Sequence, residues 1–256
     1  MINSQKIIIK LGSSLLTNKR GGVNKAVLKN VVKDIIWLLD AKKEVIVVSS
    51  GAISLGKGKL NLKHDLTLNE SQAVAARGQI ELMTAWKNEF KKYKKQVAQV
   101  LLSPSDIKNK KSSNHAIATL ENILDFNCVP IINENDTTST DEIKFGDNDI
   151  LAAQIATLIK ADHLILLSNV DGLYKEPPKT NKNDDLIKEV KSITNKIRDM
   201  AGVASKLGKG GMISKIKAAE ICMKSKCSVI ITSGLKENPI MSLGNKKTKS
   251  TKFIAK

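Results

Sequence analysis

The sequence predicts an α/β protein, a three-layer α/β/α sandwich with a mostly parallel central sheet. Two observations support this prediction: short apolar runs recur along the chain, and stretches with helical apolar spacing separate them. Runs this apolar are typical of strands that helices cover on both faces. No low-complexity linker or tandem repeat interrupts the pattern. We therefore expect one domain over residues 1–256, with an N-terminal substrate half to about 160 and a C-terminal nucleotide half over 161–256.

The predicted strands are rich in Ile, Val and Leu and lie at residues 6–10, 45–48, 97–102, 128–132, 163–167 and 228–232. The predicted helices carry apolar residues three and four positions apart. They lie at residues 24–40, 69–90, 114–126, 148–160, 193–200 and 212–225. Asn24 is a suitable N-cap for the first helix, and Thr67 or Asn69 for the second. The polar, proline-containing segment 175–185 is a predicted loop.

The chain carries a formal charge of +17, almost wholly from lysine, because only Arg20, Arg77 and Arg198 are arginines among its 42 basic residues. A solvated lysine-rich surface explains this charge. The alternative is attraction of nucleic acid or of anionic substrates. Dedicated nucleic-acid readers usually add arginine forks and aromatic platforms, whereas only 3% of these residues are aromatic. We therefore expect neither a nucleic-acid nor a membrane partner.

The cysteines Cys128, Cys222 and Cys227 form no C-x-x-C pair and no disulfide framework, so we expect reduced, buried thiols. The three histidines are scattered, and no protein metal site is predicted. The sequence has no apolar stretch long enough for a membrane helix and no secretory leader pattern. These features predict a cytoplasmic protein.

The most unusual stretch is the acidic loop, residues 133–152, which leads from a predicted strand into a predicted helix. It concentrates carboxylates in a strongly basic chain. They are Glu134, Asp136, Asp141, Glu142, Asp147 and Asp149. Ligands of open α/β sheets bind at the carboxyl ends of strands. We therefore expect this loop to form a polar pocket that holds a small charged substrate and organises cations around it.

Three further loops follow buried strands and combine small residues with a polar or charged group. They contain Lys10 with Gly12, Ser50 with Gly51 and Ala52, and Ser168 with Asn169. In a parallel sheet these loops would emerge at the same edge as the acidic loop, where glycines let backbone N–H groups approach an anion. Lys10 on its own would be an ordinary solvated lysine, but its Gly-Ser-Ser neighbours favour a role in a site.

A glycine cluster at residues 208–211 precedes the helix predicted over 212–225. Free N–H groups at a helix start, with Lys215 about one turn inside, are typical of a phosphate-binding site. The alternative is a flexible loop beside one of many lysines. By contrast, residues 51–58 nearly fit the Walker A spacing but have Gly58 where a Mg²⁺-binding Ser or Thr belongs, so no P-loop is predicted there.

Together these motifs resemble the amino-acid kinase family over residues 7–231. The most diagnostic pieces are I-N-E-N-D at 132–136 and E-I-K-F-G-D-N-D at 142–149. Supporting pieces are K-L-G-S-S at 10–14, V-S-S-G-A-I at 48–53, V-D-G-L-Y at 170–174 and G-G-M-x-x-K at 210–215. The resemblance implies the amino-acid kinase, or carbamate kinase-like, fold. It also implies ATP-dependent phosphorylation of the side-chain carboxylate of L-glutamate to L-glutamyl 5-phosphate, the first step of proline biosynthesis.

The same resemblance implies a role for each site residue. Lys10, Lys215 and Asp149 are the expected catalytic group, in which the lysines bind phosphates and Asp149 orients them. The substrate-binding residues it implies are Ser50, Gly51, Ala52, Asp136 and Asn148. The nucleotide-binding residues it implies are Lys10, Gly12, Ser168, Asn169, Lys209, Gly210, Gly211, Met212 and Lys215. Mg²⁺ would be held mainly by the phosphates of ATP and by water.

The chain departs from the family pattern at Ser168-Asn169, where the family usually has Thr-Asp, and at Lys209, where it often has Thr. These positions concern nucleotide contacts and leave the glutamate-side motifs intact. The resemblance further implies a homo-oligomer, dimer or tetramer, and feedback binding of proline. The chain ends before the C-terminal RNA-binding-like domain of many members could fit, so none is expected.

Two other functions compete with this expectation. One is a sister kinase acting on N-acetylglutamate, aspartate or a nucleoside monophosphate, which the spacing of the acidic loop disfavours. The other is an inactive regulatory or nucleic-acid-binding relative, which the presence of Lys10, Lys215 and Asp149 disfavours. A fold and its motifs do not by themselves establish activity.

Overall fold

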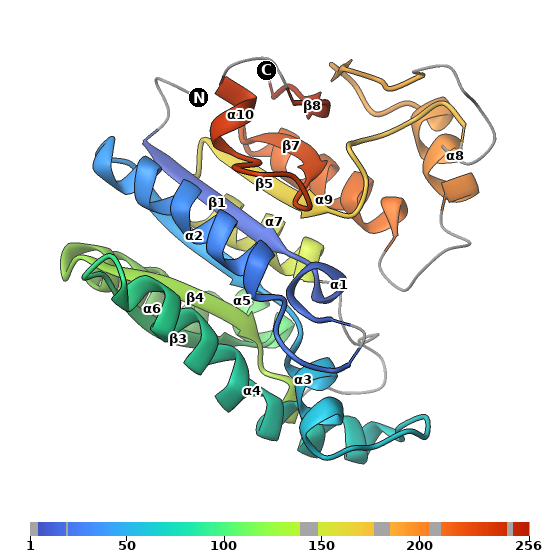
Figure 1. Ribbon diagram of the computed structural model, residues 1–256. Coiled ribbons are helices and arrows are strands. Elements are labelled where there is room, and N and C mark those ends of the chain that lie inside the picture. The colour runs from blue at the N-terminus through green and yellow to red at the C-terminus, as the bar shows by residue number, and fades with distance from the viewer. Residues whose placement is uncertain are drawn as a thin grey trace.

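The computed structural model describes residues 5–18, 20–138, 148–176, 185–204, 211–244 and 248–255. These residues form an eight-stranded sheet in the order β3-β4-β2-β1-β5-β7-β8-β6 (Figure 1). The strands are β1 (Lys6–Leu11), β2 (Glu44–Ser49), β3 (Gln96–Leu102), β4 (Cys128–Glu134), β5 (His163–Ser168), β6 (Glu189–Val190), β7 (Ser228–Ser233) and β8 (Ser250–Phe253). All neighbouring pairs are parallel except β7 and β8, which are antiparallel.

Helices flank this sheet (Figure 1). They are α1 (Ser13–Leu16), α2 (Lys25–Asp40), α3 (Ala52–Lys59), α4 (Leu68–Lys91), α5 (Pro104–Lys108), α6 (Lys110–Asp125), the 3₁₀ turn η1 (Asp136–Thr138), α7 (Asn148–Leu158), α8 (Asn195–Ala204), α9 (Met212–Lys224) and α10 (Met241–Gly244). None of the helices in the described ranges is both long and apolar enough to cross a membrane.

Two apolar cores lie on opposite faces of the sheet. Successive residues of β1 alternate between them: Ile7 and Ile9 pack with α2 and α4, and Ile8 packs with α7 and α9. This period of two follows from strand geometry, in which neighbouring side chains point to opposite faces. The predicted three-layer sandwich with a mostly parallel sheet is therefore confirmed.

Side-chain caps begin the two long helices on one face of the sheet. The Asn24 side chain accepts a hydrogen bond from the Val27 amide at the start of α2. Thr67, rather than Asn69, caps α4, and Thr67 and Glu70 form a reciprocal capping box. These caps satisfy N–H groups that a helix leaves free at its first turn.

Helix α3 lies where the sequence predicts none, because three glycines between residues 51 and 58 disfavour a helix. Tertiary packing overrides that preference. A Cβ atom on Gly56 would lie 2.0 Å from the carbonyl oxygen of Val74, and one on Gly78 would lie 1.8 Å from that of Ala52. The glycines thus allow α3 and α4 to pack backbone against backbone.

Smaller elements also differ from expectation. The helix predicted over 114–126 begins earlier, at Lys110, and the short strands β6 and β8 extend the sheet beyond the predicted strands. All three cysteines are free. The expectation that all of them are buried is wrong for Cys128, which is partly exposed at the first position of β4.

Candidate active site

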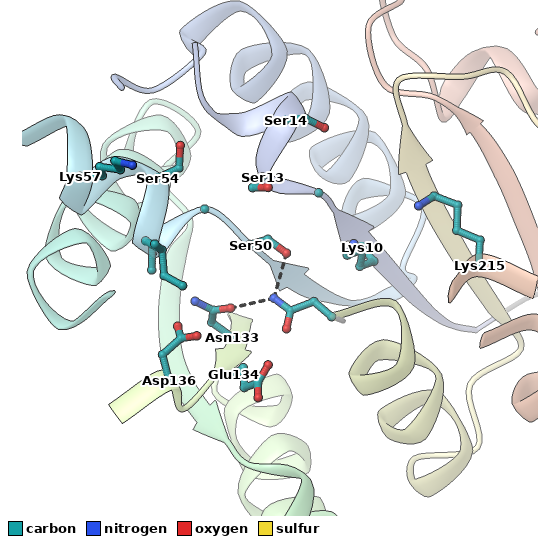
Figure 2. Close-up of a pocket in the computed structure, with 15 residues that line it drawn as sticks. Lys10, Ser13, Ser14, Ser50, Ser54, Lys57, Asn133, Glu134, Asp136 and Lys215 are labelled. Carbon is teal, nitrogen blue, oxygen red and sulfur yellow. Dashed lines mark hydrogen bonds between the residues drawn. The ribbon is translucent and has the colours of Figure 1, made fainter. Parts of the chain in front are cut away.

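A cavity of about 400 Å³ opens at the carboxyl ends of β1, β2 and β4. Figure 2 shows the polar side chains that surround it. The residues that line it are Lys10, Gly12, Ser13, Ser14, Ser50, Gly51, Ala52, Ile53, Ser54, Lys57, Asn133, Glu134, Asp136, Asn148 and Lys215. The parallel arrangement brings these segments together because all three strands end at the same edge of the sheet.

A buried carboxylate joins two lysines at one side of this cavity. Asp149 Oδ1 lies 2.5 Å from Lys10 Nζ, and Asp149 Oδ2 lies 3.0 Å from Lys215 Nζ. Ser214 Oγ also donates to Asp149 Oδ2, at 2.7 Å. All three charged residues are buried. One carboxylate at the start of α7 thus holds two ammonium groups, one from β1 and one from α9.

The charges in this group leave Asp149 ionised. Burial alone would raise the pKa of its carboxyl group, but the positive charges of Lys10 and Lys215 outweigh burial and hold that pKa at about 2. Two lysines and one aspartate give this group of three residues a net charge of +1. Such a charge, fixed in a poorly solvated place, suits an anionic ligand.

An amide side chain organises the neighbouring wall. Asn148 Nδ2 donates to Ser50 Oγ at 2.8 Å, to Asn133 Oδ1 at 2.8 Å and to the carbonyl oxygen of Ser49 at 3.0 Å. The bonds to Ser50 and Asn133 are the dashed lines in Figure 2. Gly51 follows Ser50 with φ of +113°, a left-handed conformation that glycine adopts without strain, and turns the chain into α3. The turn after β2 and the start of α7 are therefore held together at the cavity.

Two carboxylates lie at the other side of the cavity. Figure 2 shows Asp136 and Glu134 close to each other below Asn133. Burial, and then the negative charge of Glu134, raise the pKa of Asp136 to about 7. A cationic group bound here would relieve this repulsion, so this side of the cavity suits an ammonium group.

Of the predicted nucleotide residues that the structure describes, Lys10, Gly12 and Lys215 line the cavity, and Ser168, Asn169, Gly211 and Met212 lie outside its lining. Ser168 ends β5, and Asn169 Nδ2 donates to Ser14 Oγ at 3.0 Å, which links the β5 and β1 turns. Gly211 and Met212 begin α9. Lys209 and Gly210, and the acidic residues Asp141, Glu142 and Asp147, lie outside the described residues.

All predicted substrate residues line the cavity: Ser50, Gly51, Ala52, Asp136 and Asn148. Asn133, Ser54 and Lys57 also line it, although the sequence assigned them no role. Asn133 belongs to the diagnostic I-N-E-N-D motif, and this motif could have identified it as a residue of the site. Lys57 belongs to α3, not to a phosphate-binding loop.

The sequence profile of the amino acid kinase family matches residues 5–233. The chain is 45% identical to a glutamate 5-kinase of Pelagibacter ubique over 256 residues, which cover 99% of this chain and 69% of that protein. It is 44% identical to a glutamate 5-kinase of Clostridium acetobutylicum, again over 99% of this chain, and 96% of that protein is covered.

The fold resembles solved kinases that are much more distant in sequence. A UMP kinase from Ureaplasma parvum superposes with a TM-score of 0.66 at 19% identity, covering 98% of this chain and 99% of that one. This structural similarity supports the fold. The assignment to a family rests on the two glutamate 5-kinases, which match almost the whole chain at 44–45% identity. The chain therefore belongs to the amino acid kinase family and, within it, to the glutamate 5-kinases.

Proposed function

We propose that this protein transfers the γ-phosphoryl group of ATP to the side-chain carboxylate of L-glutamate, giving L-glutamyl 5-phosphate for proline biosynthesis. The observation that carries the proposal is that one cavity adjoins both the Lys10–Asp149–Lys215 group and the polar wall formed by Ser50, Asn148 and Asp136. One side suits phosphates, and the other suits the ammonium and carboxylate groups of an amino acid. Membership in the glutamate 5-kinases supports this choice of acceptor.

The amino-acid end of the substrate would lie against Asp136, Asn148 and Ser50, with Gly51 and Ala52 at the turn beside it. Ionised Asp136 would bind the α-ammonium group, and the hydroxyl of Ser50 is available to a substrate carboxylate. The side-chain carboxylate would then point toward Lys10 and Lys215.

Phosphoryl transfer to a carboxylate needs no general base, because the acceptor oxygen is already a nucleophile. The difficulty is to bring two anions together, so positioning and charge neutralisation should supply most of the catalysis. Lys10 and Lys215 would stabilise the charge on the transferred group. Asp149 would hold both lysines in place through the contacts described above.

The nucleotide would extend from Lys10 and Lys215 toward Gly12, Ser168, Asn169, Gly211 and Met212, and we propose that Lys209 and Gly210 also contact it. Mg²⁺ supplies neutralisation of phosphate charge when bound, and we propose that the phosphates and water are its main ligands. Asp149 is a poor candidate for a Mg²⁺ ligand, because both of its carboxylate oxygens already contact other side chains, Oδ1 that of Lys10 and Oδ2 those of Lys215 and Ser214. Among the described residues no cluster of three His, Cys, Asp or Glu side chains could hold a metal.

ADP release with a panel of acceptors tests the proposal. The panel contains L-glutamate, N-acetylglutamate, aspartate and a nucleoside monophosphate, each with ATP and Mg²⁺. We expect turnover with glutamate. We expect Lys215→Ala to lower kcat by about 10²–10³-fold, equivalent to about 3–4 kcal/mol of transition-state stabilisation, by analogy with a lost oxyanion donor. Lys224→Ala is the matched control, because Lys224 is exposed at the end of the same helix.

Turnover that is absent with glutamate, or independent of it, would contradict the proposed acceptor. A preference for another member of the panel would instead support the sister-kinase alternative. Full activity of Lys215→Ala would leave the acceptor assignment standing and remove the proposed role of that lysine.

We also propose a single kinase domain with a substrate half and a nucleotide half, assembly into a dimer or tetramer, and feedback binding of proline. The continuous sheet of the described residues supports the single domain.

The three free cysteines favour a reducing compartment, and we propose the cytoplasm. Light scattering and inhibition by added proline would test assembly and feedback.

A further inference from the structure

A side chain behind the cavity, Gln79 of α4, is connected to the substrate wall. The preceding residue, Gly78, packs so closely on α3 that a Cβ atom there would lie 1.8 Å from the Ala52 carbonyl oxygen and 2.5 Å from the Gly56 amide nitrogen. Helix α4 also packs against η1, which carries Asp136. Gln79 itself does not line the cavity. Its backbone is therefore fixed against the two turns that border the substrate.

Three side-chain amides form a chain of hydrogen bonds from α4 to the cavity. Gln79 Oε1 accepts from Asn133 Nδ2 at 2.9 Å, and Asn133 Oδ1 accepts from Asn148 Nδ2 at 2.8 Å. An amide has nearly the same shape when its oxygen and nitrogen exchange places, so its partners decide which end donates. If Asn133 turned over, its Nδ2 would face Asn148 Nδ2, and two donors would meet. The Ser49 carbonyl oxygen can only accept, so it fixes the direction of Asn148 and, through it, of Asn133. Gln79 supplies the acceptor that the buried Asn133 Nδ2 then needs.

This direction leaves the Asn148 oxygen without a partner in the described part of the chain. Asn148 Oδ1 is buried and has no hydrogen-bond partner among the described residues, whereas Asn148 Nδ2 already serves three oxygens. A buried acceptor without a partner is unfavourable. Because Asn148 lines the cavity, a donor on the substrate, such as an α-ammonium group, would satisfy this oxygen.

Gln79 has an unsatisfied group of its own. Its Nε2 is buried without a partner among the described residues, so the side chain makes one hydrogen bond and leaves one donor unmatched. An apolar side chain of similar length would avoid this unfavourable burial. A purely structural role therefore explains glutamine poorly, and a role as the acceptor that holds Asn133 in place explains it well.

We propose that Gln79 is a positioning residue that holds Asn133, and through it Asn148, in the arrangement that binds the ammonium end of the amino-acid substrate. This inference rests on the proposed glutamate kinase function. It predicts an effect on the amino-acid substrate and none on the nucleotide, because no described contact joins Gln79 to Lys10, Asp149 or Lys215.

The test compares Gln79→Met, which keeps the length but removes the acceptor, with Gln79→Glu, which keeps an acceptor for Asn133. For Gln79→Met we expect KM for glutamate to rise about tenfold, the effect of a misplaced hydrogen bond. We expect KM for ATP and the melting temperature to stay close to wild type. Gln79→Glu should recover most of the glutamate affinity. Asn88→Leu, at an exposed amide of α4, is the matched control.

A second comparison uses Asn133→Asp, whose carboxylate still accepts from Asn148 but has no N–H group that needs Gln79 as an acceptor. Gln79→Met should therefore change KM for glutamate by less than about twofold in the Asn133→Asp background. The comparison remains informative if Gln79→Met folds poorly. A structural role of Gln79 would raise KM for glutamate equally in the wild-type and Asn133→Asp backgrounds.

Three results would overturn the proposal: an unchanged KM for glutamate in Gln79→Met, equal increases in KM for glutamate and ATP, or additive effects with Asn133→Asp. None of these results would affect the proposed function, because that function depends on glutamate turnover by the wild-type protein. Absence of glutamate turnover in the wild type would overturn both proposals together.

Discussion

Two aspartates of one loop, Asp136 and Asp149, show how the surroundings decide what a carboxylate does. Both are shielded from water, and burial alone would raise the pKa of each. Asp149 contacts two lysines, which hold its pKa at about 2, whereas Asp136 lies near Glu134, and its pKa rises to about 7. Asp149 is therefore a permanent anchor for cations, and Asp136 changes its charge near neutral pH.

This difference predicts how glutamate binding depends on pH. Below pH 7 Asp136 is mostly protonated and attracts an ammonium group weakly. Above pH 7 it is ionised and binds that group well. We therefore expect kcat/KM for glutamate to rise between about pH 6 and pH 8, with an inflection near the Asp136 pKa of about 7.

Measurement of kcat/KM for glutamate at saturating ATP and Mg²⁺ checks this expectation. Asp136→Asn is the control, since its profile reports any ionisation of ATP or of other groups. The variant should lose the inflection and have a higher KM for glutamate at pH 8. Identical profiles for the wild type and the variant would show that Asp136 does not control this pH dependence.

Helices α3 and α4 define the site at the scale of elements. The turn before α3 contributes Ser50, Gly51 and Ala52 to the cavity, and α4 supports that turn from behind through Gly78. Local sequence preference disfavours α3, yet contact with α4 stabilises it. The position of the substrate wall is therefore set by helix packing as well as by the loop sequence.

This packing predicts that Gly78→Ala is harmful. Glycine to alanine inside a helix normally stabilises by up to about 1 kcal/mol. Here the new Cβ atom would lie 1.8 Å from the Ala52 carbonyl oxygen, so α4 must move away from α3. We expect the free energy of unfolding to fall by about 1–3 kcal/mol, and KM for glutamate to rise because the turn at Ser50 shifts.

Urea unfolding and steady-state kinetics measure the two effects. Gly244→Ala is the matched control, because a Cβ atom at Gly244, the last residue of α10, would meet no atom of the described residues within 4 Å. Wild-type stability of Gly78→Ala would contradict the close packing of α3 on α4.

The main layers and the cation group could be predicted from the sequence. All six predicted strands are present, and five of them, β1, β2, β4, β5 and β7, are buried along most of their length, so their apolar runs are a local and strong signal. In the edge strand β3 only Leu102 is buried. The approach of Lys10 and Lys215 to Asp149 was expected from the resemblance, and the structure brings the three together.

Features that depend on distant contacts could not be predicted in this way. Helix α3 was missed because its stability comes from α4, and β6 is only two residues long, too short for a periodic signal. The role of Gln79 depends on a hydrogen bond to Asn133, which is 54 positions away in the chain. No pattern of residue types near Gln79 indicates that contact.

The whole molecule is strongly basic, and both proposed substrates are anions. A charge of +17 should favour their approach over a wide surface. The cavity is lined by Lys57 and by the two lysines that contact Asp149, and the side that carries Glu134 and Asp136 is acidic. We therefore expect the overall charge to attract anions, and the difference in charge between the two sides of the cavity to orient the bound substrates.

The identity of the product tests the central claim most directly. An acyl phosphate reacts with hydroxylamine to give a hydroxamate, so the reaction is run with ATP, Mg²⁺, L-glutamate and hydroxylamine, and the hydroxamate is compared with the ADP released. We predict equal amounts of the two, the hydroxamate at the side-chain carboxyl group, and neither product without glutamate. ADP release without hydroxamate, or a hydroxamate at the α-carboxyl group, would contradict phosphoryl transfer to the side chain of glutamate.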